Sequence, residues 1–204
     1  MKNLEKVVAS IETELDEKDH IREVALKSSR AVIRLAGGIL KGMHRGEDQT
    51  AALAELRDEV SQMNSLVAEH PDLANAGYVE GAMQEYSEVA IVLSLLQNGD
   101  VPSPEDIGVK SVAYLLGLGD TVGELRRFCL DALKRGDIKR ANHFLDTMED
   151  LSHALMRFDY PDAIVAVRKK QDVARSLLEK TRGEVAVAAS NRELRDTLDG
   201  LLKR

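Results

Sequence analysis

The stretch Gln84-Glu85-Tyr86-Ser87-Glu88 lies inside a segment, residues 72–97, in which apolar residues recur every three or four positions. This period is typical of an α-helix, so Glu85 and Glu88, three residues apart, are predicted to share one helix face. The residues that follow them, from Val89 to Val92, are all apolar. Two carboxylates on such a half-buried face repel each other and resist desolvation unless a cation lies between them.

A second pair of acids lies in Gly-Leu-Gly-Asp-Thr-Val-Gly-Glu-Leu, residues 117–125, where Asp120 and Glu124 are four residues apart on another predicted helix. Helical bundles build metal sites from carboxylates on facing helices. Carboxylates without imidazoles select hard cations such as Mg²⁺ or Mn²⁺. The pattern therefore indicates a carboxylate-bound divalent metal, and ordinary surface carboxylates are the alternative.

The composition of the 204 residues favours an all-α protein. Only 3% of residues are aromatic, and no alternating run of β-branched residues persists, so the strand pattern is missing. The net charge of -7 argues mildly against a nucleic-acid partner. A single cysteine, Cys129, excludes an internal disulfide and suits a reducing compartment, which we expect to be the cytoplasm. Cys129 itself is predicted to be a small core residue, and no apolar segment predicts secretion or membrane insertion.

The apolar period and its interruptions predict about seven helices within one domain, residues 1–204. Pro71 and Gly183 are expected to end helices, and Ser103-Pro104 to begin one. Gly37-Gly38 in mid-helix indicates either a kink or a close helix contact. The predicted spans are about 3–18, 19–45, 49–69, 72–97, 104–135, a sixth ending near 157, and 162–182, followed by a weakly amphipathic helical tail over 184–204.

Two clusters of basic residues have the spacing to follow a phosphodiester backbone, although a solvated helix face is the alternative for each. The scarcity of aromatic residues does not support recognition of bases by stacking. The first cluster forms one narrow stripe on the helix 19–45, and the second lies on the helix 162–182. The members are Lys27, Arg30, Arg34, Lys41 and Arg45 in the first, and Arg168, Lys169, Lys170, Arg175, Lys180 and Arg182 in the second.

Over nearly its whole length the chain resembles the translin family, and within it the branch of translin-associated factor X. The resemblance depends on several short motifs that occur in the proper order and at the proper spacing. They are Gln-Glu-Tyr-Ser-Glu at 84–88, Tyr-Leu-Leu-Gly-Leu-Gly-Asp at 114–120, Gly-Glu-Leu-Arg-Arg at 123–127 and Lys-Thr-Arg-Gly-Glu at 180–184.

This resemblance implies an all-α bundle of about seven helices that assembles into hollow homo-oligomers, typically octamers, and binds single-stranded RNA or DNA. In the translin-associated factor X branch it also implies a Mg²⁺-dependent endoribonuclease, with Mn²⁺ as the other candidate ion. By that resemblance Glu88 and Glu124 are expected to bind the metal directly. Glu85 and Asp120 are expected to complete the catalytic site and to orient the attacking water.

Compared with eukaryotic members, the chain is shorter, and it lacks both their insertion between the fourth and fifth helices and their basic N-terminal extension. We therefore expect a compact, archaeal form in which one polypeptide both builds the shell and cuts RNA. Two other functions stay open. The first alternative is a non-catalytic scaffold that binds RNA or DNA. The second is an all-α nucleoside triphosphate pyrophosphohydrolase. The latter class normally has Glu-x-x-Asp as its second motif, where this chain has Asp-x-x-x-Glu.

Overall fold

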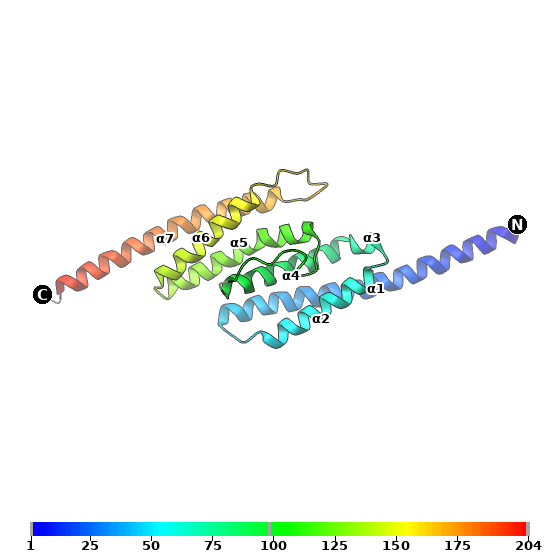
Figure 1. Cartoon of the computed structure of the whole chain (residues 1–204), viewed down its shortest axis with the longest axis horizontal. Coiled ribbons are helices and arrows are strands. Elements are labelled where there is room, and N and C mark those ends of the chain that lie inside the picture. The colour runs from blue at the N-terminus through cyan, green and yellow to red at the C-terminus, as the bar shows by residue number, and fades with distance from the viewer. Residues whose placement is uncertain (1, 98, 203–204) are drawn as a thin grey trace. The chain divides into compact units, whose positions relative to one another are not determined.

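The computed structural model describes residues 2–97 and 99–202, which form seven α-helices and no strand (Figure 1). This confirms the predicted all-α class. The chain divides into two compact units, Met1–Val89 and Ala90–Arg204, and the boundary between them falls inside the helix α4 (Gly77–Leu96). That the chain is a single domain stays a prediction. None of the described helices is both long enough and apolar enough to cross a membrane.

The first unit contains α1 (Lys2–Arg45), α2 (Thr50–Val67), α3 (Pro71–Ala74) and most of α4. Helices α1 and α2 pack side by side as a hairpin (Figure 1). They bury aliphatic side chains at helical spacing, and the Ser28 hydroxyl donates a 2.6 Å hydrogen bond across the pair to the Glu59 carboxylate. The buried residues are Ala25, Val32, Ala36 and Ile39 of α1 and Leu56, Val60, Met63 and Val67 of α2.

Helix α1 is continuous, so the predicted break between residues 18 and 19 is wrong. Asp19 is a residue type that favours helix N-caps, but its carboxylate accepts a 2.9 Å hydrogen bond from the Arg22 guanidinium one turn later. No glycine or proline is present at this point to stop the helix. The helix ends instead at Gly46, which has a φ of 71° and is followed by a hydrogen bond from the Glu47 amide to the Gly42 carbonyl.

The second unit contains α5 (Ser111–Lys134), α6 (Ile138–Leu155) and α7 (Arg168–Leu202), which pack against one another (Figure 1). The Phe128 and Phe144 rings lie 5.7 Å apart between α5 and α6. Cys129 is fully buried, and its thiol lies 3.3 Å from the Ala141 carbonyl. The prediction that Cys129 is a core residue is therefore confirmed.

Helix α5 begins at Ser111, seven residues later than the predicted start at 104. The expected cap does form, because the Ser103 hydroxyl accepts from the Asp106 amide at 3.2 Å and the Asp106 carboxylate accepts from the Ser103 amide at 2.9 Å. These bonds also lower the pKa of Asp106. The turn that they cap ends at Gly108, whose φ of 66° does not continue a helix.

Helix α7 begins at Arg168 rather than 162, and it runs through Gly183, so the predicted stop at Gly183 is wrong. A glycine in a helix interior costs only about 1 kcal/mol, and contacts on both sides of Gly183 offset this cost. Thr181 is buried, and Arg126 of α5 donates to both Thr181 and Glu184 at 2.6 and 2.8 Å.

Candidate functional site

The first pair of predicted site residues lies on α4. Glu88 is only 7% exposed and Glu85 is half-buried, and each interacts with other groups of the protein. Ser87 between them is fully buried, and its hydroxyl donates to the Met83 carbonyl at 2.7 Å. A carboxylate as deeply buried as that of Glu88 destabilises a protein unless it is paired with a cation or donors. This burial fits a residue with a specific charged partner and does not fit a surface carboxylate.

The second pair lies on α5 in the other unit. The side chains of Asp120 and Glu124 are 27% and 22% exposed. Asp120 accepts a 2.5 Å hydrogen bond from the Lys170 ammonium of α7, and Glu124 lies 4.0 Å from the Arg127 guanidinium. Asp120 is therefore held by a cation from a different helix.

The donor chemistry of these four residues fits a hard divalent cation, because all the candidate ligands are carboxylate oxygens. Within residues 2–97 and 99–202, however, no group of three or more Asp, Glu, His or Cys side chains is close enough to hold a metal ion. Glu85 and Glu88 belong to the first unit, whereas Asp120 and Glu124 belong to the second. That the two pairs share one ion stays a prediction.

Every member of the basic stripe of α1 is exposed. It lies on the face opposite the buried residues Ala25, Val32 and Ile39, as the helical period requires. Arg45 at its end is 3.6 Å from Glu47. In the part of the chain that the structure describes, the other four members, Lys27, Arg30, Arg34 and Lys41, make no ion pair.

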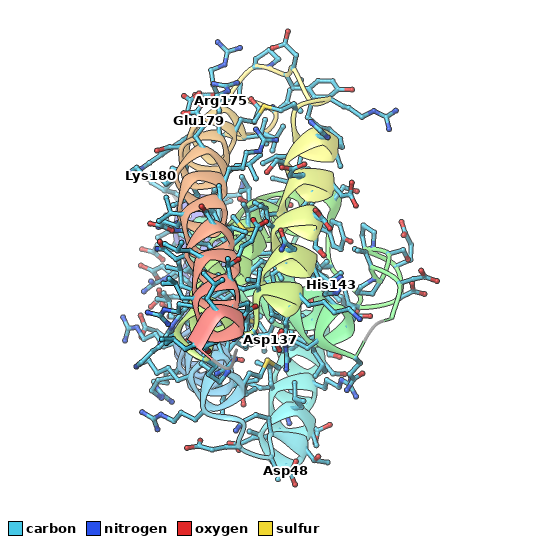
Figure 2. The ribbon with its side chains drawn as sticks, turned by 90° about the vertical axis from the view of Figure 1, so that its left-hand side faces the viewer. Asp48, Asp137, His143, Arg175, Glu179 and Lys180 are labelled. Atoms are coloured by element: carbon cyan, nitrogen blue, oxygen red, sulfur yellow. The ribbon has the colours of Figure 1, made fainter. Side chains whose placement is uncertain are left out.

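The basic cluster of α7 is different, because acids neutralise most of it. Figure 2 shows that Arg175, Glu179 and Lys180 follow one side of this helix, so both signs of charge are present there. Among these cations, only Lys169 and Lys180 have no ion pair with a described residue. The pairs are Arg168 with Asp159 at 3.2 Å, Lys170 with Asp120 at 2.5 Å, Arg175 with Asp172 at 3.2 Å and Arg182 with Glu149 at 2.6 Å.

The sequence analysis did not identify an apolar groove in the second unit. Its volume is about 410 Å³, and residues from three segments line it, with Tyr114, Phe158 and Tyr160 as its aromatic members. The Tyr114 hydroxyl donates to the Pro102 carbonyl at 2.6 Å, and burial raises the pKa of this tyrosine. Because these residues are far apart in the sequence, no local pattern indicates the groove.

Comparison with known proteins identifies the family. The model of the translin family matches residues 20–183. The chain belongs to the translin family. An uncharacterised protein of Methanocaldococcus jannaschii is 34% identical over 188 residues, which cover 90% of this chain and 83% of that protein.

Three solved structures have the same fold as this translin-family chain. A chain of AfC3PO in complex with duplex RNA aligns with a TM-score of 0.80 and 28% identity, over 91% of this chain and 97% of its own length. Another AfC3PO structure aligns with a TM-score of 0.77 and 29% identity, over 91% of this chain and 98% of its own length. Apo-NeC3PO aligns with a TM-score of 0.79 and 22% identity, over 89% of this chain and 96% of its own length. At this low identity the alignment shows a common fold alone. The predicted translin-type fold is thus confirmed.

The family match leaves out the two ends of the chain, and both ends carry exposed apolar stripes. The first part of α1 extends beyond α2 and α3, and the last part of α7 extends beyond α6 (Figure 1). The spacing of three, four or seven residues along each stripe is that of a helix-packing face. The exposed apolar residues are Leu4, Val7, Val8, Ile11 and Leu15 in α1, and Val187, Leu194, Leu198 and Leu201 in α7.

Proposed function

We propose that this translin-family protein binds RNA through the basic stripe of α1. The observation that carries this proposal is the row of four exposed cations, Lys27, Arg30, Arg34 and Lys41, which no described acid neutralises. The AfC3PO chain that was solved with duplex RNA supports the choice of ligand, since it is 28% identical over 91% of this chain.

Cations arranged in this way contact phosphates and release condensed counterions, and this contribution to binding does not depend on sequence. The favoured ligand is single-stranded RNA, with single-stranded DNA as a second substrate for the same contacts. Labelled single-stranded RNA titrated with wild-type protein at rising salt tests the proposal. Affinity that does not change with salt would exclude a phosphate-binding stripe.

We further propose that the protein is an endoribonuclease of the translin-associated factor X type, dependent on Mg²⁺ or Mn²⁺. Glu88 and Glu124 would be the principal ligands of the ion. Glu85 and Asp120 would complete the metal site with their own carboxylates and would orient the attacking water. An ion held there would supply a water molecule of lowered pKa and would neutralise charge on the phosphate. The burial of Glu88 in an apolar helix favours this role, because a carboxylate attracts a cation more strongly away from bulk water.

Cleavage of labelled RNA in Mg²⁺ tests the enzymatic proposal, with wild type, Glu88→Gln and added EDTA compared side by side. Glutamine has nearly the shape of glutamate but removes the charge, and a circular dichroism spectrum establishes that the variant is folded. We expect cleavage by the wild type alone, and only without EDTA. RNA binding without cleavage would indicate the non-catalytic scaffold, and equal cleavage in every reaction would show contamination or the wrong site.

We also propose that the protein forms a homo-oligomer, with an octamer as the expected size. The apolar stripes at the two ends of the chain support this, because exposed apolar faces of this kind are typical of protein interfaces. Light scattering coupled to size-exclusion chromatography gives the subunit number directly. A monomer at micromolar concentration would refute the proposal.

A further inference from the structure

Lys170 differs from the other cations of α7, because it is directed into the protein. Its side chain is 25% exposed, and that of its partner Asp120 is 27% exposed. The pair joins α7 to α5 across a separation of 50 residues in the sequence, with a short contact of 2.5 Å. By contrast, the neighbouring Lys169 is exposed and has no ion pair with a described residue.

Gly119 of α5 is what allows Lys170 to approach. A Cβ atom added at Gly119 would lie 2.8 Å from the Cβ and 3.1 Å from the Cγ of Lys170. A Cβ atom essentially never comes as close to another atom as the shorter of these two distances, so any side chain at position 119 would displace the lysine. The aliphatic part of Lys170 therefore lies on the bare backbone of α5, and its ammonium reaches the next residue, Asp120.

We propose that Lys170 is the resident cation of Asp120 and competes with a divalent ion for this carboxylate. The inference rests on the proposed function, in which Asp120 belongs to a metal site. An ammonium and a divalent ion attract the same carboxylate oxygen and repel each other. The ion therefore binds Asp120 only as Lys170 moves away, and Lys170 is a positioning residue that sets how tightly the ion is held.

The test measures binding of Mn²⁺ to the full-length protein, from the decrease of the free-ion signal in electron paramagnetic resonance. Lys170→Met keeps the unbranched side chain against Gly119 but removes the ammonium. We expect it to lower the Kd for Mn²⁺ by about three- to tenfold, the factor for releasing one partly buried ion pair. Lys169→Met is the matched control, since it removes the same charge from the adjacent, exposed position, and it should leave the Kd within about twofold of wild type.

A second comparison isolates the contact with Asp120. In an Asp120→Asn background, Lys170→Met should no longer change the Kd, because the carboxylate for which the two cations compete is absent. Thermal melts of all variants establish that they are folded.

Three results would overturn the inference. An unchanged Kd in Lys170→Met would show that the ion does not displace the lysine. A higher Kd would show that Lys170 instead holds Asp120 in the orientation that the ion needs. If no variant binds Mn²⁺, and the wild type does not either, both the proposed metal site and the competition are refuted. If Mn²⁺ binds with a Kd that does not depend on Lys170, only the competition is refuted.

Discussion

Removing two cations from the basic stripe of α1 should weaken RNA binding far more than removing two cations from α7. The variant Arg30→Ala/Arg34→Ala deletes two exposed guanidinium groups that make no ion pair with a described residue. Arginine and alanine both favour helices, so the fold should tolerate the change. In the bound state each of these groups is expected to neutralise one phosphate.

The magnitude follows from counterion release. Each phosphate contact on a single strand contributes about 0.7 to the slope of log K against log salt concentration, so the double variant should flatten the slope by about 1.4. A slope of about 0.7 means that each contact strengthens binding about fivefold when the salt concentration falls from about 1 M to about 0.1 M. At about 0.1 M salt, losing one contact should therefore weaken binding about fivefold, and losing both about 25-fold.

Fluorescence anisotropy with a labelled single-stranded RNA between 50 and 200 mM salt, about the range over which such slopes are measured, provides the assay. The matched control is Arg175→Ala/Arg182→Ala, which changes the net charge equally. These two arginines are paired with Asp172 and Glu149 at 3.2 and 2.6 Å, so the slope should hardly change. An equal loss of slope in both variants would refute the reasoning that the pairs on α7 withhold those cations from RNA.

Other predictions concern stability, assembly and the buried thiol. Gly183→Ala should raise the melting temperature by about 2–4 °C in circular dichroism, because the helix gains a better helix former and, apart from the adjoining part of α7 itself, no described atom lies within 4 Å of the added Cβ. Ile11→Glu should reduce the oligomer size in light scattering without lowering the melting temperature of the subunit, since this side chain is 50% exposed in the single chain; Lys6→Glu is its polar-face control. Burial raises the pKa of Cys129 to about 11, so the folded protein holds very little of the reactive thiolate at about pH 8. A disulfide reagent at that pH should therefore modify Cys129 only as fast as the protein unfolds. Because the thiol pKa is higher in the folded state, the stability that it contributes should be present below pH 9 and be lost as the pH rises towards 11.

The fold class was accessible from the sequence because helical periodicity is a local property, and several helix ends, such as the one at Arg45, were predicted as well. Other ends were not accessible, among them the starts of α5 and α7 and the stop predicted at Gly183. Gly183 and Gly46 look alike in the sequence, yet only Gly46 adopts a positive φ and ends its helix. What carries α7 through Gly183 is Arg126, 58 residues before its partner Glu184. A contact over such a distance has no signature near the glycine, so a stop predicted from the residue type alone was wrong.

The candidate acids were also partly accessible from the sequence. The spacing of Glu85 and Glu88 places them on one helix face, and the apolar residues around them anticipated the burial of Glu88. The partner of Asp120 was not accessible, because Lys170 reaches it only through the gap that Gly119 leaves. In the structure the Lys170 side chain occupies the space beside Gly119.

The two basic clusters show why counting charges does not identify a binding surface. On sequence alone both helices present rows of cations, and the α7 cluster is the richer of the two. Three of the acids that neutralise it come from elsewhere in the chain: Asp159 before the helix, Asp120 on α5 and Glu149 on α6. Since an anion that binds these cations must first displace a carboxylate, their contribution to RNA affinity is reduced by the energy of each pair. The stripe of α1 has no such competition from described acids, and for this reason we place the proposed RNA-binding surface on α1.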